Sequence, residues 1–175
     1  MLAVGALVCI AALAGSSYAS ESSVTGCQIA NMRLSFGPLV SEKTGQHTAS
    51  VVLSNRLSRA CTLKGYPTIA LLDRHGRKLS FTYSHHGDQE ITSKKPAEVR
   101  VPAGGSSFFA FNKYRCDVRA LDVTRTLRVA LPGSDIIRSV RMRQYPIIDY
   151  CGKAITPYVA VSPIERHLRS VFWFS

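Results

Sequence analysis

The sequence predicts an all-β fold, specifically an antiparallel immunoglobulin-like β-sandwich, and three observations lead to that prediction. Short segments in which apolar and polar residues alternate recur along the chain, and this period of two is typical of half-buried strands. Gly and Pro turn signals separate the segments at short intervals. No long stretch with a helical period occurs before the C-terminal tail. Eight or nine short strands with regular turns are the sequence pattern of such a sandwich.

The predicted strands follow one another with recognisable turns between them. Residues 69–72 form a continuously apolar run, as expected for a strand that is covered on both faces. The turn around Gly76 joins this run to residues 79–83 in a predicted hairpin. The predicted strands comprise residues 30–36, 49–53, 69–72, 79–83, 99–101, 106–111, 127–131, 136–142 and 158–161.

The length and charge of the chain limit its function class. Its 175 residues suit one domain plus a short processing segment, and such a domain can bury a core without a metal. Lys and Arg total 22 against 11 Asp and Glu, which gives a formal net charge of +11 and a pI of about 9.8. We therefore expect the surface to attract anions, although charge alone identifies no partner.

The N-terminal residues have the pattern of an export signal. Residues 1–19 carry no charged side chain, and their apolar run ends in small residues that favour cleavage after Ala19. This assigns residues 1–19 to a signal peptide, 20–26 to a short linker and 27–163 to the β-sandwich domain. We expect the mature chain, which has no predicted transmembrane span, to be extracellular, periplasmic or associated with the cell envelope. An uncleaved membrane anchor is the main alternative, because the usual basic n-region is missing.

A lipid-anchored form is a second alternative, because residues 24–27 resemble a bacterial lipobox that ends in Cys27. Two features argue against it. A polar stretch that includes Glu21 separates the motif from the apolar run, and lipidation would remove Cys27 from disulfide formation. We therefore expect Cys27 to pair with another cysteine.

Four cysteines remain in the predicted mature chain, because Cys9 lies in the signal segment. They are Cys27, Cys61, Cys116 and Cys151, and an even number behind an export signal predicts two disulfides. The absence of a C-x-x-C motif disfavours redox or zinc chemistry. Counting strand reversals from Cys27 places all four at one pole of the sandwich. We favour Cys61 with Cys116 and Cys27 with Cys151, since first and last strands are often neighbours, while four cysteines allow three pairings.

The C-terminal tail, residues 164–175, is predicted to form a short amphipathic helix. Ser162 is a suitable N-cap residue, and Pro163 suits the first helical position. The apolar face of this helix would comprise Ile164, Leu168, Val171 and Phe172. We expect that face to cover the sandwich. Docking to a membrane or a partner through the aromatic residues 172–174 is the alternative.

The segments around the cysteines resemble an exported bacterial family, the domain of unknown function 4232. The most specific match is residues 61–67, which run from Cys61 to Pro67, with Asn55 before them. Supporting matches, in order, are Cys27, Leu72-Asp73 with Gly76, Pro102 with Gly104-Gly105-Ser106, Cys116, and residues 151–163. The inserted Ala103 departs from the pattern, and the tail extends past the usual family end. The resemblance implies an exported sandwich domain with paired cysteines and no particular activity.

The sequence offers one metal-like cluster, His85 and His86 with Asp88 and Glu90, in a polar loop at residues 84–97 that we expect to be exposed. Their spacing matches no defined metal site, so a solvated loop is the favoured interpretation. The sequence contains no serine nucleophile elbow, phosphate loop or H-E-x-x-H motif. We therefore expect no enzymatic activity, and we assign no catalytic residue and no cofactor.

Seven arginines are the candidate binding residues: Arg115, Arg119, Arg125, Arg128, Arg138, Arg141 and Arg143. Arginine binds carboxylates and phosphates through paired hydrogen bonds. We expect a non-enzymatic binding or envelope-structural module whose partner is an anionic envelope component or a protein; an ordinary solvated surface is the other interpretation. Aromatic residues are not interleaved with the arginines, so nucleic acid is not expected as a partner. The alternative function is a metal-handling or hydrolytic protein centred on His85 and His86.

Overall fold

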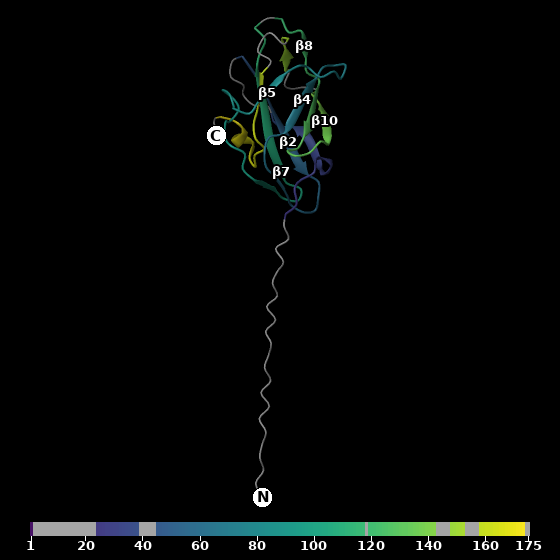
Figure 1. Cartoon of the computed structure of the whole chain (residues 1–175), viewed down its shortest axis with the longest axis vertical. Helices are drawn as coiled ribbons and strands as arrows, with labels where there is room; N and C mark the ends of the chain where they lie inside the picture. Colours follow the sequence, from purple (N-terminus) through teal and green to yellow (C-terminus); the bar gives the residue numbers. More distant parts are fainter. Residues whose placement is uncertain (2–23, 39–44, 118, 143–147, 153–157, 174–175) are drawn as a thin grey trace.

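Twelve β-strands and two short 3-10 helices make up the part of the chain that the structure describes (Figure 1). The structure is a computed structural model, and it describes Met1 and residues 24–38, 45–117, 119–142, 148–152 and 158–173. The predicted all-β class is confirmed. No helix in these ranges is long and apolar enough to cross a membrane. The predicted signal peptide lies outside the described residues apart from Met1.

Five strands form the larger sheet, in the order β1-β2-β7-β12-β5. They are β1 (Met32–Phe36), β2 (Gln46–Asn55), β7 (Ser106–Tyr114), β12 (Tyr158–Val161) and β5 (Thr82–Ser84). The long central strands β2 and β7 pair antiparallel over nine positions, from Gln46 opposite Tyr114 to Ser54 opposite Ser106. The edge strand β5 runs parallel to β12. The prediction of a purely antiparallel fold is therefore wrong at this edge.

Three antiparallel strands form the second sheet, in the order β10-β9-β4. Their bounds are β10 (Ile137–Arg141), β9 (Thr126–Ala130) and β4 (Thr68–Leu72). The predicted hairpin between β4 and residues 79–83 forms only at its base, where Lys78 makes a single antiparallel bridge with Leu72. The chain then crosses to the larger sheet and forms β5, because Leu79 and Phe81 are buried in the core that the two sheets share. That hairpin prediction is wrong beyond its turn.

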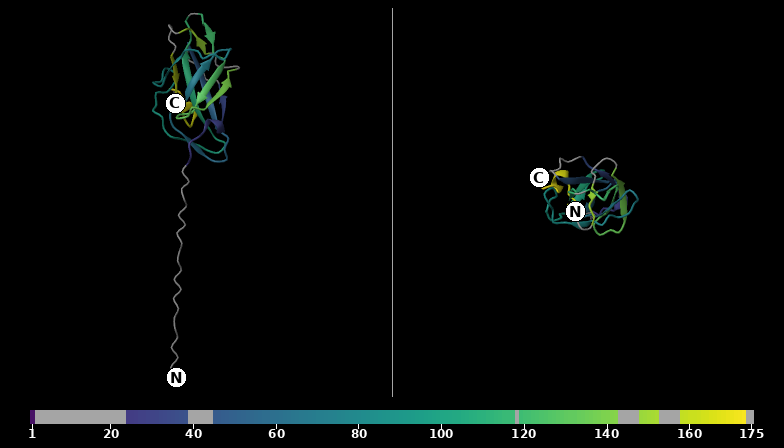
Figure 2. Two further views of the ribbon diagram at one scale, coloured as in Figure 1. Left: turned by 45° about the vertical axis from the view of Figure 1, so that its right-hand side comes forward. Right: turned by 90° about the horizontal axis from the view of Figure 1, so that it is seen from above.

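Two short strand pairs lie outside the main sheets. One joins β3 (Cys61–Leu63) to β6 (Val99–Val101), and the other joins β8 (Asp122–Val123) to β11 (Asp149–Tyr150). Figures 1 and 2 show β8 at the end of the molecule opposite the purple start of the described chain. The sequence pattern does not indicate β3, β8 or β11; β8 and β11 have two residues each, which are too few to establish a period.

A single apolar core fills the space between the inner faces of the two main sheets. Phe109 and Phe111 come from β7 of the larger sheet, and Leu71, Leu127 and Val129 come from β4 and β9 of the smaller one. All five are 0 % exposed. Burial of large apolar side chains from both sheets is the main stabilising contribution to the fold.

The outer face of the larger sheet is covered by a second, smaller apolar cluster. Ala110 of β7 and Ala160 of β12 pack there with Ile91 of the 84–97 loop and Val171 of the tail. The Thr92 N–H donates to the Val171 carbonyl at 3.1 Å, which ties the loop to the tail. The loop was predicted to be exposed throughout, and this is wrong for its middle, where residues 90–92 are buried.

The tail covers this face without forming the predicted α-helix. It contains the four-residue 3-10 helix η2 (Leu168–Val171), and the backbone before η2 is extended, since Glu165 pairs with Phe108 of β7. The predicted N-cap Ser162 instead accepts the Ala110 N–H at 2.9 Å through its hydroxyl oxygen. Pairing with the sheet therefore replaces the helix. Residues 174–175 lie outside the described part of the chain.

Candidate functional site

The four cysteines form two disulfides, Cys27 with Cys61 and Cys116 with Cys151. The Cα atoms are 4.9 Å and 5.7 Å apart in the two bonds, within the usual range for disulfides. Two disulfides were predicted correctly, but the favoured pairing of Cys61 with Cys116 and Cys27 with Cys151 is wrong. Because Cys27 is bonded to Cys61, it has no free thiol for lipid attachment.

The length of β2 and β7 explains why the favoured pairing fails. Asn55 ends β2 and donates its N–H to the Gly105 carbonyl just before β7 begins, and Cys61 pairs with Val101 in β3 and β6 near that end. Cys116 follows the opposite end of β7. At about 3.4 Å per residue, the nine paired positions separate the two ends by roughly 27 Å. The prediction counted β6 as a full passage, whereas β6 is a three-residue strand that stays at the pole of Cys61.

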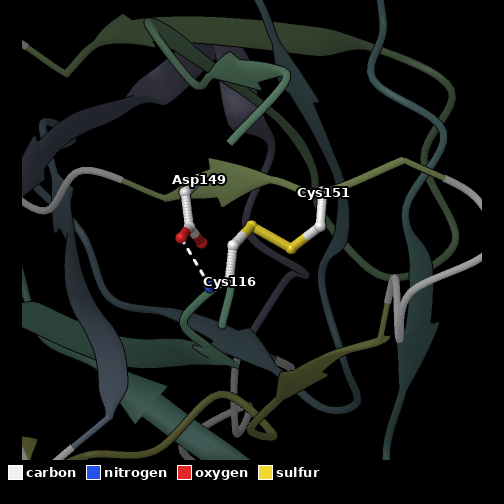
Figure 3. A group of neighbouring side chains, drawn as sticks. All are labelled: Cys116, Asp149 and Cys151. Atoms are coloured by element: carbon white, nitrogen blue, oxygen red, sulfur yellow. Dashed lines mark hydrogen bonds between the residues drawn. A yellow bond between two sulfur atoms is a disulfide. The ribbon is translucent and has the colours of Figure 1, made fainter. Parts of the chain in front are cut away.

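Polar side chains surround the second disulfide. Asp149 accepts the Cys116 N–H at 2.6 Å, as Figure 3 shows, and it accepts a second bond from the Lys113 ammonium at 3.0 Å. The Lys113 side chain is 2 % exposed, and its Nζ lies 3.5 Å from Cys151 Sγ. Among the described residues, Cys116, Asp149 and Cys151 form a group of three potential metal ligands whose ligand atoms all lie within 4.8 Å of one another. The two sulfur atoms are bonded to each other in the disulfide, so Cys116 and Cys151 act here as a cross-link.

The histidine cluster does not converge on one point. The His85 ring stacks on Tyr66, with centroids 4.0 Å apart and planes 5° apart. Desolvation, followed by the charge of the neighbouring His86, lowers the pKa of His85. The Asp88 carboxylate accepts the Glu90 N–H at 2.8 Å and the Asn112 side-chain N–H at 2.7 Å, so it organises the loop. Within the described residues these four side chains form no group of three ligand atoms.

The predicted arginines do not share one face. Arg125, Arg128 and Arg141 lie on or beside the smaller sheet and are exposed. Arg138, like Arg141, lies on β10, but it pairs with the buried Val129 and therefore lies on the other face of the strand. Its guanidinium donates to the Ala30 carbonyl at 3.1 Å. Arg115 and Arg119 lie in the connection between β7 and β8, near the second disulfide, and Arg143 lies outside the described residues.

Two of these arginines line a cleft that the sequence did not reveal. Its volume is about 600 Å³, and it lies between the turn after β4 and the paired ends of β9 and β10. Its lining residues are Asp73, Arg74, His75, Gly76, Arg125, Thr126, Arg141 and Met142. Three arginines therefore line one concave surface.

The turn after β4 holds its side of the cleft in a fixed shape. Asp73 Oδ1 accepts the backbone N–H groups of His75 and Arg77 at 2.7 Å and 2.9 Å, and Oδ2 accepts Arg77 Nε at 2.7 Å. Gly76 has a φ of 77°, which favours glycine at this position. Arg74 Nε donates to His75 Nε2 at 2.8 Å. Residues 73–77, Asp-Arg-His-Gly-Arg, are the signal that the sequence offers for this side of the cleft, and by themselves they predict only a turn.

The electrostatics of the cleft favour an anion. Burial raises the pKa of Asp73, but the hydrogen bonds and the charge of Arg77 outweigh it, and the pKa is lowered overall. The same carboxylate raises the pKa of Arg77. The one carboxylate in the lining is thus engaged by Arg77, whereas Arg74, Arg125 and Arg141 make no salt bridge with any described residue. Guanidinium groups with free donors bind carboxylates and phosphates.

Comparison with known families gives one match. The family described as "Domain of unknown function (DUF4232)" matches residues 27–164, and the chain therefore belongs to this family. No curated protein and no solved structure matches the chain.

Proposed function

We propose that this member of the DUF4232 family is an exported, non-enzymatic binding module that holds an anionic ligand in the cleft lined by Arg74, Arg125 and Arg141. The observation that carries the proposal is that these three arginines line one concave surface of about 600 Å³, in which Arg77 already engages the carboxylate of Asp73. The formal charge of +11 would steer anions to the surface from a distance.

Export and an immunoglobulin-like fold are parts of the same proposal. Two disulfides are typical of proteins that mature in oxidising compartments, and the apolar run in residues 1–19 is typical of a signal peptide. A five-stranded and a three-stranded sheet around one core support an immunoglobulin-like sandwich.

The alternative centred on His85 and His86 has less support. The His85 ring is stacked on Tyr66, and Asp88 is occupied by hydrogen bonds within the loop and to Asn112. A metal would have to displace these contacts before it gained ligands. We therefore place the binding function in the cleft.

Fluorescence anisotropy with labelled hexaglutamate tests the proposal. We expect binding that weakens as ionic strength rises, and a loss of about tenfold or more in affinity in the double variant Arg125→Gln/Arg141→Gln. Arg100→Gln is the matched control, because Arg100 is an exposed arginine on β6, outside the cleft lining. The double control Arg100→Gln/Arg169→Gln removes the same charge from two exposed arginines outside the cleft lining. Equal affinities for the two double variants would contradict the cleft as the site.

A further inference from the structure

A second hollow lies on the same face of the smaller sheet as the cleft. Its volume is about 250 Å³, and the outward-facing apolar residues Ala70, Ala130 and Ile137 are among its lining residues. Two cationic residues, Lys78 and Arg128, also border it. Small-molecule sites usually have about 300–1,000 Å³, so a hollow of this size suits a single apolar side chain.

The strand register places the cleft and the hollow in one line. Arg141 lies opposite Thr126 at the cleft, and Ile137 lies opposite Ala130 at the hollow. Thr126 and Ala130 are four residues apart on β9 and therefore face the same way, at a separation of about 13 Å. Arg128 lies midway between them on the same face.

This face remains exposed in the described part of the chain. Arg128 and Ile137 are exposed, and Ile137 retains 56 % of its accessible surface. The charged residues bordering the cleft and the hollow are cationic except for Asp73, which Arg77 engages. An occupant must therefore supply negative charge along the line and an apolar group at one end.

We propose that the partner at this face is an acidic polypeptide segment bound in extended conformation, with carboxylates at the cleft and at Arg128 and an apolar side chain in the hollow. The proposal rests on the proposed function and names its ligand class. An extended chain rises about 3.3 Å per residue and presents alternate side chains to one side. The spacing then specifies carboxylates at positions i and i+2 and an apolar residue at i+4. A uniform polyanion would leave the hollow empty.

The register of the peptide provides the sharpest test. The probe is a fluorescein-labelled peptide Ser-Asp-Thr-Asp-Thr-Ile-Ser, and its control is Ser-Asp-Thr-Asp-Ile-Thr-Ser, which has the same composition but directs the isoleucine to the other side. We expect the probe to bind the purified protein about tenfold more tightly than the control. Equal binding of the two peptides would overturn the proposal.

Two protein variants separate this inference from the proposed function. Ile137→Ser should abolish the preference for the probe and leave hexaglutamate binding unchanged. Ile136→Ser is the matched control, because Ile136 is 57 % exposed but does not line the hollow. If hexaglutamate binds and Ile137→Ser does not affect the probe, the peptide proposal fails alone; if hexaglutamate does not bind, the proposed function fails. Binding to phosphatidylglycerol vesicles that requires Ile137, without probe binding, would identify a lipid surface as the occupant and overturn the peptide.

Discussion

The outer faces of the two main sheets differ in what covers them. On the larger sheet, the 84–97 loop and the tail cover Ala110 and Ala160, and Ile91 and Val171 are 0 % exposed there. On the smaller sheet, the outward-facing Arg128, Ile137 and Arg141 remain exposed. Both faces are formed in the same way, by the residues of each strand that point away from the core. The difference is whether another part of the chain packs on them.

The covered face and the exposed face are expected to contribute differently to stability and to the proposed binding. The covered face adds apolar contacts and buried hydrogen bonds, so its side chains are expected to contribute to the free energy of unfolding. The exposed face holds the cleft and the hollow, and the cationic side chains that line them make no salt bridge with any described residue. Changes on it should alter binding and leave stability nearly unaffected.

The largest expected effect concerns matched isoleucines on the two faces. Ile91→Ala removes a side chain with 0 % exposure and should lower the free energy of unfolding by about 2–5 kcal/mol. Ile137→Ala, at 56 % exposure, should change it by about 0.5 kcal/mol or less. Urea unfolding measures both. Similar losses for the two variants would show that the comparison is mistaken.

A smaller effect is expected where Asp88 fastens the loop to the larger sheet. Its carboxylate accepts the N–H groups of Glu90 and Ile91 and one side-chain N–H of Asn112. Asp88→Ala should therefore lower the free energy of unfolding by about 1–3 kcal/mol. Asp135→Ala is the control, because Asp135 is exposed on the turn before β10. Hydrogen exchange of residues 90–92 should accelerate in Asp88→Ala alone, and unchanged exchange would argue against this role.

The smallest effects concern pH, and they have opposite signs on the two faces. Asp73 beside the cleft has a lowered pKa, so its contribution to stability is present above its unfolded pKa of about 3.9 and is lost as pH falls through the folded value. Glu165 in the tail has a pKa that burial raises, against the opposing charges of Lys94 and His167. Its contribution is present below its unfolded pKa of about 4.3 and is lost as pH rises through the folded value.

Urea unfolding across the acidic range separates these two groups. Asp73→Asn should reduce the loss of stability on acidification, and Glu165→Gln should reduce the loss as pH rises above that range. Each variant is the control for the other. If both variants shift the pH dependence in the same direction, at least one of the two assignments is wrong.

The sequence predicted local structure best where alternation was long or turns were clear. Residues 158–161 and 99–101 were predicted with the bounds that β12 and β6 have. Strand β2 extends the predicted 49–53 at both ends, and β7 extends the predicted 106–111 at its C-terminal end. The tail was mispredicted because Ser162 and Pro163 are a good helix start only when no strand competes for the following backbone. Here Phe108 pairs with Glu165, and this pairing overrides the local preference.

The candidate site was predictable only in part. Arg125 and Arg141 were among the predicted binding residues and do line the cleft, whereas Arg74 was not among them. Arg74 is separated from Arg125 by about fifty residues of sequence, and only the pairing of β4 with β9 brings the two segments together. Arg138 was predicted as a binding residue but does not line the cleft, because its pairing with Val129 places it on the opposite face of β10 from Arg141.

The all-β class, the family, the presence of two disulfides and the excess of positive charge could all be predicted from the sequence. Alternation records which side of a strand is buried, and cysteine number records how many bonds can form. Neither records which segments become neighbours. The tertiary structure alone decided that Cys27 bonds to Cys61, that β5 joins the larger sheet, and that three arginines share one cleft. Those outcomes depend on contacts between residues distant in the chain, and local pattern carries no information about such contacts.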